Sequence, residues 1–162
     1  MLANPQATSS LTDAFPTPQL NRAPQQYVTF RSAGGHYGAG IMQVQEIRSW
    51  QPTAPLPNRS RAARGVLDIR GSVVEVYDLS LLLGDAQLEP DKGSVILVLC
   101  LPSRVVGLLV ESVSDIIQVE AGSTMAVPSD SQNPQDACLA AMVNHEGTLV
   151  GLLDLDLLLS LN

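Results

Sequence analysis

Polar and apolar residues alternate along 65–84 in a way that predicts two strands joined by a tight turn. The turn signal lies between Asp68, whose carboxylate can accept hydrogen bonds from turn amides, and Gly71, which can adopt a left-handed backbone. Asp78 follows the second strand and can cap a short leucine helix that ends at Gly84. The stretch is therefore expected to form a strand, a turn, a strand and one helical turn.

A second copy of this pattern occupies residues 141–160, without a gap and 76 positions further along the chain (141 minus 65). Asn144 stands at the position of Asp68, and asparagine bonds its own turn in the same way. Glu146, however, stands at the position of Arg70, so the charge on the turn is not repeated. The recurring residues are expected to be scaffold, and the residues that differ are expected to be specific.

The segment before each hairpin is repeated as well, at an offset of 69 positions (107 minus 38). Residues 38–47 and 107–116 share the pattern G-x-x-[IV]-x-x-V-x-[ED]-I, and 37–50 predicts a strand with a short helical interruption. Repeats of this length with many short strands predict two small related β-barrels. The acidic link 85–92 is expected to be the joint between the two barrel halves.

Composition and charge narrow the class of protein. The chain has 162 residues, of which 45% are hydrophobic and only 4% aromatic, so its core must be aliphatic. Residues 1–25 are rich in Pro, Gln, Ser and Thr and are expected to form a flexible tail before a folded part over 26–162. The net charge of -7 argues against nucleic acid or an anionic lipid surface as a partner. No signal-peptide pattern and no apolar run of ~20 residues is present, so a cytoplasmic location is expected.

The sequence offers no pattern typical of an active site or a metal centre. His36 and His145 have no partner at metal-ligand spacing, and Cys100 and Cys138 lie far apart. Phosphate loops, dinucleotide fingerprints and nucleophile elbows are missing from the sequence as well. We therefore expect no enzyme activity, no cofactor and no metal.

Basic residues gather in one part of this acidic chain. Four of the nine stand within a dozen positions, at Arg59, Arg61, Arg64 and Arg70. One interpretation is a solvated loop that keeps the molecule soluble. The other is a contact patch for an acidic partner surface, because arginine suits bidentate carboxylate recognition. The residue pattern leaves both interpretations open.

Several segments resemble the CheW family of chemotaxis coupling proteins. They read VQEIRSWQPTAPLPN and RGVLDIRGSVVEVYDL in the first half, and RVVGLLVESVSDI in the second. The resemblance covers residues 27–162 and implies a mainly β, CheW-like fold of two five-stranded SH3-like barrels with short helical turns and a short C-terminal helix. It also implies a non-catalytic adaptor that joins the regulatory domain of a CheA-type histidine kinase to the cytoplasmic tips of chemoreceptors.

The resemblance further implies where partners bind, with receptor tips in a groove between the barrels and the kinase at barrel ends. The residues placed at partner surfaces in this way are Val44, Glu46, Arg64, Asp68, Arg70, Val105 and Val106. Two positions depart from the family pattern, which usually has Asn at Asp68 and often has Pro at Glu75. The second departure is expected to return an amide donor to an edge strand.

Two alternatives to flagellar chemotaxis remain at this point. The same module serves type IV pilus and other chemosensory pathways, and the sequence does not distinguish them. A small-molecule-binding β-barrel protein would instead need a pocket with convergent polar groups.

Overall fold

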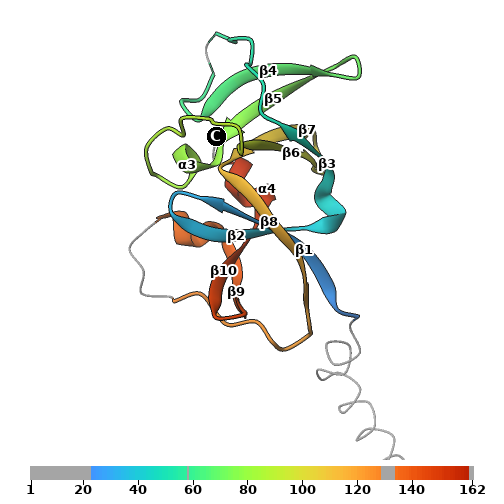
Figure 1. Ribbon diagram of the computed structural model, residues 1–162, viewed down its shortest axis with the longest axis vertical. Coiled ribbons are helices and arrows are strands. Elements are labelled where there is room, and N and C mark those ends of the chain that lie inside the picture. The colour runs from blue at the N-terminus through green and yellow to red at the C-terminus, as the bar shows by residue number, and fades with distance from the viewer. Residues whose placement is uncertain (1–22, 58, 129–133, 161–162) are drawn as a thin grey trace, which may run out of the picture.

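The computed structural model describes residues 23–57, 59–128 and 134–160, and it contains two five-stranded sheets (Figure 1). Sheet A has the order β8-β1-β2-β10-β9 and sheet B the order β3-β6-β7-β5-β4. The strands of sheet A are β1 (Gln25–Ser32), β2 (Gly35–Gly40), β8 (Ser112–Val119), β9 (Leu139–His145) and β10 (Thr148–Leu153). Those of sheet B are β3 (Val44–Ser49), β4 (Ala63–Ile69), β5 (Ser72–Asp78), β6 (Val95–Cys100) and β7 (Val105–Val110).

Within the residues that the structure describes, three short helical segments connect these strands and a fourth follows the last strand. They are η1 (Ile41–Gln43), α3 (Leu79–Leu82), η2 (Pro134–Cys138) and α4 (Leu155–Ser160). The predicted helical interruption between two strands is confirmed by η1, and the predicted mainly β fold is confirmed by the two sheets. In the described part of the chain no helix has the length and apolar character needed to span a membrane.

Each sheet takes strands from both copies of the repeat. Sheet A combines β1 and β2 of the first copy with β8, β9 and β10 of the second, and sheet B combines the remaining strands in the same way. The chain passes between sheets at η1 and again at Glu111, whereas the link 85–92 joins two elements on the side of sheet B. The structure thus differs from the expectation that the barrels meet at this link. The repeat in the sequence specifies the local elements, but it does not specify which copy each strand pairs with.

The two predicted hairpin turns have the same backbone conformation. Arg70 and Gly71 have φ values of 55° and 85°, and Glu146 and Gly147 have 51° and 83°. Positive φ at both central residues is the conformation that fits a two-residue hairpin to the twist of its strands. Asp68 Oδ1 accepts a hydrogen bond of 2.8 Å from the Gly71 amide, as predicted.

The predicted helix caps are also confirmed. Asp78 Oδ1 accepts a 2.9 Å hydrogen bond from the Ser80 amide at the start of α3. Asp154 Oδ1 accepts one of 3.1 Å from the Leu157 amide in α4. Each carboxylate satisfies an amide that the first helical turn leaves unpaired, so each hairpin leads directly into a capped leucine helix.

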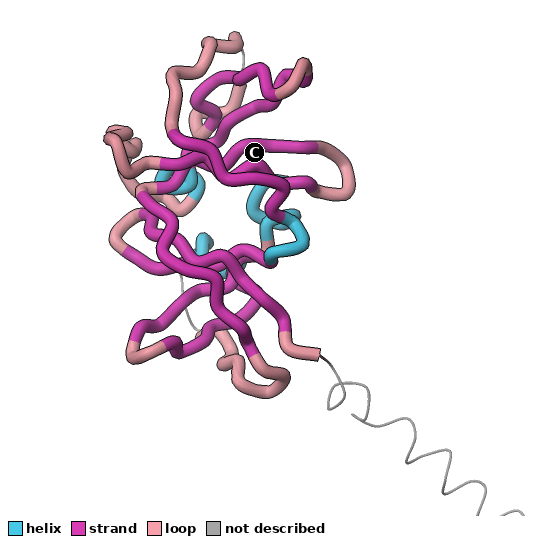
Figure 2. The backbone as a smooth tube through the Cα atoms, turned by 45° about the vertical axis from the view of Figure 1, so that its right-hand side comes forward, coloured by secondary structure: helices cyan, strands magenta, loops and turns pink. Residues whose placement is uncertain are grey.

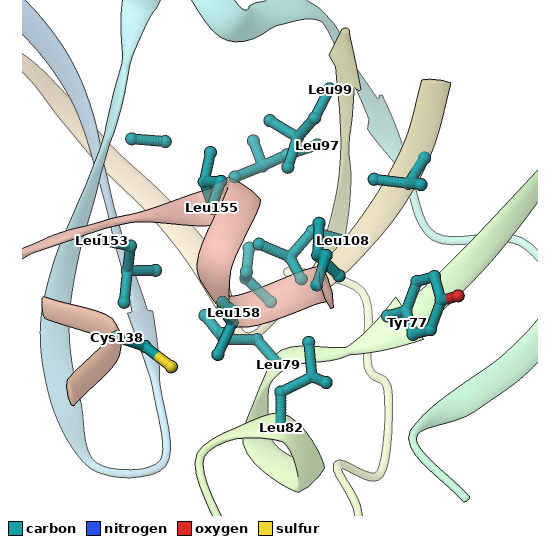
Figure 3. Close-up of a cluster of buried hydrophobic side chains, with 14 of the residues drawn as sticks. Tyr77, Leu79, Leu82, Leu97, Leu99, Leu108, Cys138, Leu153, Leu155 and Leu158 are labelled. Atoms are coloured by element: carbon teal, nitrogen blue, oxygen red, sulfur yellow. The ribbon is translucent and has the colours of Figure 1, made fainter. Parts of the chain in front are cut away.

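Among the described residues, the buried apolar side chains form three clusters, and the largest one belongs to both sheets. It includes Phe30 and Leu153 of sheet A, Leu97 and Leu108 of sheet B, and the leucines of α3 and α4. Figure 2 shows helical segments between the two groups of strands, and Figure 3 shows leucines of both helices beside those of β6 and β7. The other two clusters lie within sheet A and within sheet B. The leucine helices therefore join two units that each have their own core.

Candidate partner-binding site

The centre of the candidate site is a carboxylate between two arginines. Glu46 lies on β3, and its Oε1 accepts a 2.9 Å hydrogen bond from Arg48 Nη1. Its Oε2 lies 3.0 Å from Arg70 Nη2, in an ion pair without hydrogen-bond alignment. The Glu46 side chain is only 16% exposed, whereas that of Arg70 is 74% exposed. Glu46 therefore orients a guanidinium whose larger part faces the solvent.

The turn holds Arg70 in place through its backbone. Arg70 is the first central residue of the β4–β5 hairpin turn, and the Asp68 carboxylate is bonded to the Gly71 amide. The side chain of Arg70 has no part in that bond, and it reaches Glu46 while staying largely exposed. The structure brings three of the predicted site residues together. Asp68 and Arg70 lie on this hairpin, and Glu46 lies on β3, at the other end of the strand order of sheet B.

The two valines predicted for the same surface lie in different environments. Val105 is 38% exposed, but Val106 is fully buried in the core cluster shared by both sheets. Successive side chains of a strand point to opposite faces, so the two cannot both meet a partner. The prediction for Val106 as a contact residue is wrong. Val44 is half-buried and packs against the same cluster.

Arg64 binds within its own chain. Its Nη1 lies 3.2 Å from Asp78 Oδ2 and donates a 2.9 Å hydrogen bond to the Leu88 carbonyl, while its guanidinium lies over the Trp50 ring. The Arg64 side chain is 15% exposed and the Asp78 side chain is fully buried. Asp78 Oδ2 also accepts the Leu88 amide. Arg64 thus fixes the link after α3 to sheet B, and no pattern in the sequence indicated this contact.

Glu75 is the centre of a second charged cluster. It lies 3.2 Å from Arg59 Nε, accepts the Tyr77 hydroxyl, and has Arg104 at 4.0 Å. Arg104 also donates a 3.2 Å hydrogen bond to the Leu159 carbonyl in the last turn of α4. Desolvation raises the pKa of Tyr77, and its hydrogen bond to Glu75 raises that pKa further. The cluster connects β5 and the β6–β7 loop to the end of α4.

The position of Glu75 corrects one expectation. Its strand, β5, pairs with β4 on one side and with β7 on the other, so it is an interior strand and has no free edge. The backbone at this position lies between two paired strands, because Glu75 is opposite Val66 on β4 and Val106 on β7. The amide of Glu75 is therefore not a donor on a free sheet edge. The carboxylate, in contrast, meets Arg59 and Tyr77, and no motif in the sequence indicated these contacts.

Exposed apolar side chains lie next to the charged site along the chain. Ile47 follows Glu46 on β3 and is exposed, and Val73 follows the Arg70 turn and is exposed as well. Contiguous apolar patches are typical of surfaces that a partner covers, whereas single exposed apolar side chains are ordinary. The second copy of the repeat exposes the equivalent residues, Ile116 and Leu149. The period-two pattern could have indicated Ile47, since its neighbours on β3 are polar.

Within the described residues, no group of His, Cys, Asp and Glu side chains is arranged to hold a metal ion. The arrangement that the structure does show is a rigid hairpin with one oriented arginine and an apolar residue beside it. This arrangement can bind a carboxylate on another protein surface.

The structure thus defines a mainly β protein of two small five-stranded units, joined by leucine helices and carrying an arginine on a hairpin turn. The family is shown by a CheW-like domain model that matches residues 26–162, so the chain belongs to the CheW family. It is 34% identical over 137 residues to "Chemotaxis protein CheW" of Rhizobium meliloti, covering 85% of this chain and 88% of that protein. It is 25% identical over 130 residues to "Chemotaxis protein CheW" of Bacillus subtilis, covering 80% and 83%.

A solved structure shows the same fold. The scaffolding protein TtCheW from Thermoanaerobacter tengcongensis superposes with a TM-score of 0.76, covering 85% of this chain and 89% of that one. Its sequence identity to this chain is 22%, so the likeness concerns the fold.

Proposed function

We propose that this chain is a non-catalytic adaptor that couples chemoreceptors to a CheA-type histidine kinase. Membership of the CheW family and relatives named as chemotaxis proteins support this proposal. The observation that supports a particular binding site is the Glu46–Arg70 ion pair, in which Glu46 orients an exposed arginine on a rigid turn. In this role the chain acts in the cytoplasm and is recruited to membrane-associated receptor arrays.

The kinase regulatory domain is the proposed partner of the Glu46–Arg70 turn, and receptor tips are the proposed partner of the groove between the two units. Val44 packs against the core that both sheets share, and Val105, on the same sheet as Val44, is 38% exposed, which supports contacts near that groove. Asp68 acts indirectly, because its carboxylate fixes the turn. Arg64 and Val106 are not proposed as partner contacts, because Arg64 is bound within its own chain and Val106 is buried in the shared core. Both are expected to stabilise the fold.

Reconstitution tests this function directly. The kinase from the source organism would be combined with receptor-containing membranes, with and without the chain, and autophosphorylation would be measured. Receptor control of the kinase that requires the chain is the expected result. Kinase activity that responds equally to receptors without the chain would contradict the proposal. Parallel assays with kinases of flagellar and pilus pathways would identify the pathway.

A further inference from the structure

The internal repeat identifies a second site by comparison with the first. In sheet B, Glu46 on β3 pairs with Val98, next to a register shift in the β3–β6 ladder. In sheet A, Asp115 on β8 pairs with Thr29, next to a register shift in the β1–β8 ladder. Both pairs keep the offset of 69 positions (115 minus 46 and 98 minus 29). Asp115 is therefore the structural counterpart of Glu46, just as Glu146 on the second turn is the counterpart of Arg70.

In the second copy, the position that corresponds to Arg70 carries no positive charge, because it is occupied by Glu146. Where sheet B places Arg70 3.0 Å from Glu46, sheet A has the two carboxylates of Asp115 and Glu146. Both line one pocket of about 290 Å³, here called the acidic pocket. Its other polar residues are Thr29, His36, Ser114, His145 and Thr148.

The acidic pocket exists because apolar residues of sheet B are replaced in sheet A. The counterparts of Thr29, His36 and His145 are Val98, Val105 and Ile69, of which Val98 and Ile69 are buried in the core. In sheet A these positions carry hydroxyl and imidazole groups that face a cavity. Polar groups that converge on one concave site are the feature that fixes and orients a bound ligand.

The chemistry of the pocket favours a cation that offers several hydrogen-bond donors. Its lining offers carboxylate and hydroxyl oxygens, and among the described residues that line it there is no lysine or arginine. His145 Nε2 lies 3.9 Å from Glu146 Oε2, which is beyond hydrogen-bond distance. Asp115 Oδ1 accepts the Ile116 amide, which holds this carboxylate in place.

We propose that the acidic pocket binds the guanidinium group of an arginine on a partner protein. Sheet B provides the precedent, because there a guanidinium occupies the equivalent place beside the equivalent carboxylate. A planar guanidinium can bond two carboxylates at once, which a compact ammonium cannot do with the same geometry. This site is separate from the Glu46–Arg70 turn and does not depend on the pathway proposed above.

A small probe tests the pocket without any knowledge of the partner. The full chain would be titrated with N-acetyl-arginine amide and followed by two-dimensional amide NMR at pH 8, where histidine side chains ordinarily carry no charge. N-acetyl-citrulline amide, which is neutral and of the same shape, is the matched control. We expect saturable shifts of the Ile116 and Gly147 amides with the arginine probe alone, because these amides are next to the two carboxylates.

Three variants connect those shifts to the pocket. Asp115→Asn keeps the acceptor for the Ile116 amide, and Glu146→Gln changes a side chain that is 86% exposed, so both should fold. Each should weaken probe binding roughly two- to fivefold, the effect of losing one exposed ion pair. Glu146→Arg places a cation where sheet B has Arg70 and should abolish binding. Glu120→Gln, at an exposed loop position, is the control and should bind the probe like the native chain.

The outcomes separate clearly. Equal shifts with both probes, shifts elsewhere in the molecule, or unchanged binding in Glu146→Gln would each overturn the proposal. If Asp115→Asn does not fold, Glu146→Gln decides the question on its own. Failure at the acidic pocket would leave the kinase assay and the Arg70 variants unaffected, so the two proposals can fail independently.

Discussion

Arg70→Glu separates a structural role of the turn from a binding role. Arg70 has a φ of 55°, a conformation that costs energy for most side chains. Glu146 has nearly the same φ, 51°, on the equivalent turn, so a glutamate is compatible with this backbone. The bond between Asp68 and the Gly71 amide does not involve residue 70 and should persist in the variant.

The expected loss of folding stability is small. The native ion pair with Glu46 involves an arginine that is 74% exposed, and solvent-screened pairs of this kind contribute about 0–1 kcal/mol. A second carboxylate near Glu46 adds repulsion of about 1 kcal/mol at most, since two unit charges 4 Å apart interact by about that much in water. Glu46 also retains its hydrogen bond to Arg48. The free energy of unfolding should therefore fall by about 1–2 kcal/mol.

The expected loss of binding is larger. If Arg70 meets a carboxylate of the kinase regulatory domain, the variant replaces attraction by repulsion in a contact that excludes water. Truncating or reversing one member of such a pair costs about 2–5 kcal/mol, which is more than a tenfold loss of affinity. Titration calorimetry against the kinase domain measures the affinity, and urea unfolding of the same samples measures the stability.

Arg61→Glu is the matched control, because it makes the same charge change at an exposed position of the preceding loop. Long-range electrostatics would weaken binding in both variants alike, whereas a direct contact would weaken it only in Arg70→Glu. Unchanged affinity in Arg70→Glu for both kinase and receptor would refute the role given to this turn. A collapse of the unfolding curve would instead make Arg70 a structural residue.

Three further substitutions test the scaffold. Gly71→Val should lower the free energy of unfolding by about 1–3 kcal/mol, because Gly71 has a φ of 85°; a loss near zero in a urea titration would contradict this strain. Asp78→Ala should cost about 3–5 kcal/mol in the same assay, because it leaves the guanidinium of Arg64 unpaired in a largely buried site; a change below 1 kcal/mol would count against that ion pair as a support of the fold. In Tyr77→Phe, the free energy of unfolding should decrease less steeply with rising pH in the alkaline range than it does in the native chain. The folded state raises the pKa of Tyr77 above 10.0, so the native chain keeps this contribution below that pH and loses it as the pH rises past the folded pKa. An equally steep decrease in the variant would exclude this contribution.

The local elements could be predicted from the sequence because their signals are local. A turn needs an Asx side chain and a glycine within a few positions, and the repeat showed the same signal twice. The same holds for Asp78, which caps a helix that begins at the next residue. These contacts are determined by spacing along the chain, so they do not depend on the rest of the fold.

The exchange of strands between the two copies could not be predicted in this way. Pairing of β2 with β10, or of β5 with β7, brings together segments far apart in the chain, and both copies offer similar apolar edges. The burial of Val106 could not be predicted from the sequence for a related reason. Its strand, β7, lies between β6 and β5 and is apolar on both faces, so the alternation that distinguishes inside from outside is missing.

The contacts of the charged residues at the site could not be predicted from the sequence either. The cluster of arginines was visible in the sequence, but it does not form a single patch. Arg64 is bound to Asp78 and Arg59 to Glu75, while Arg70 is bound to Glu46 and has the most exposed side chain of these three arginines. Only the resemblance brought Glu46 and Arg70 together before the structure did, because no rule of spacing connects two different strands.

The two turns also explain how one scaffold can carry two different surfaces. The backbone conformation at residues 70 and 146 is fixed by the hydrogen bonds from Gly71 to Asp68 and from Gly147 to Asn144, of 2.8 and 3.0 Å. The side chains of Arg70 and Glu146 take no part in these bonds, and both extend into solvent. Their charge can therefore change with little effect on folding, while a change at the Asx or glycine positions would alter the hairpin itself. Under the roles proposed for the two turns, the residues that select a partner are therefore ones that contribute little to the stability of each unit.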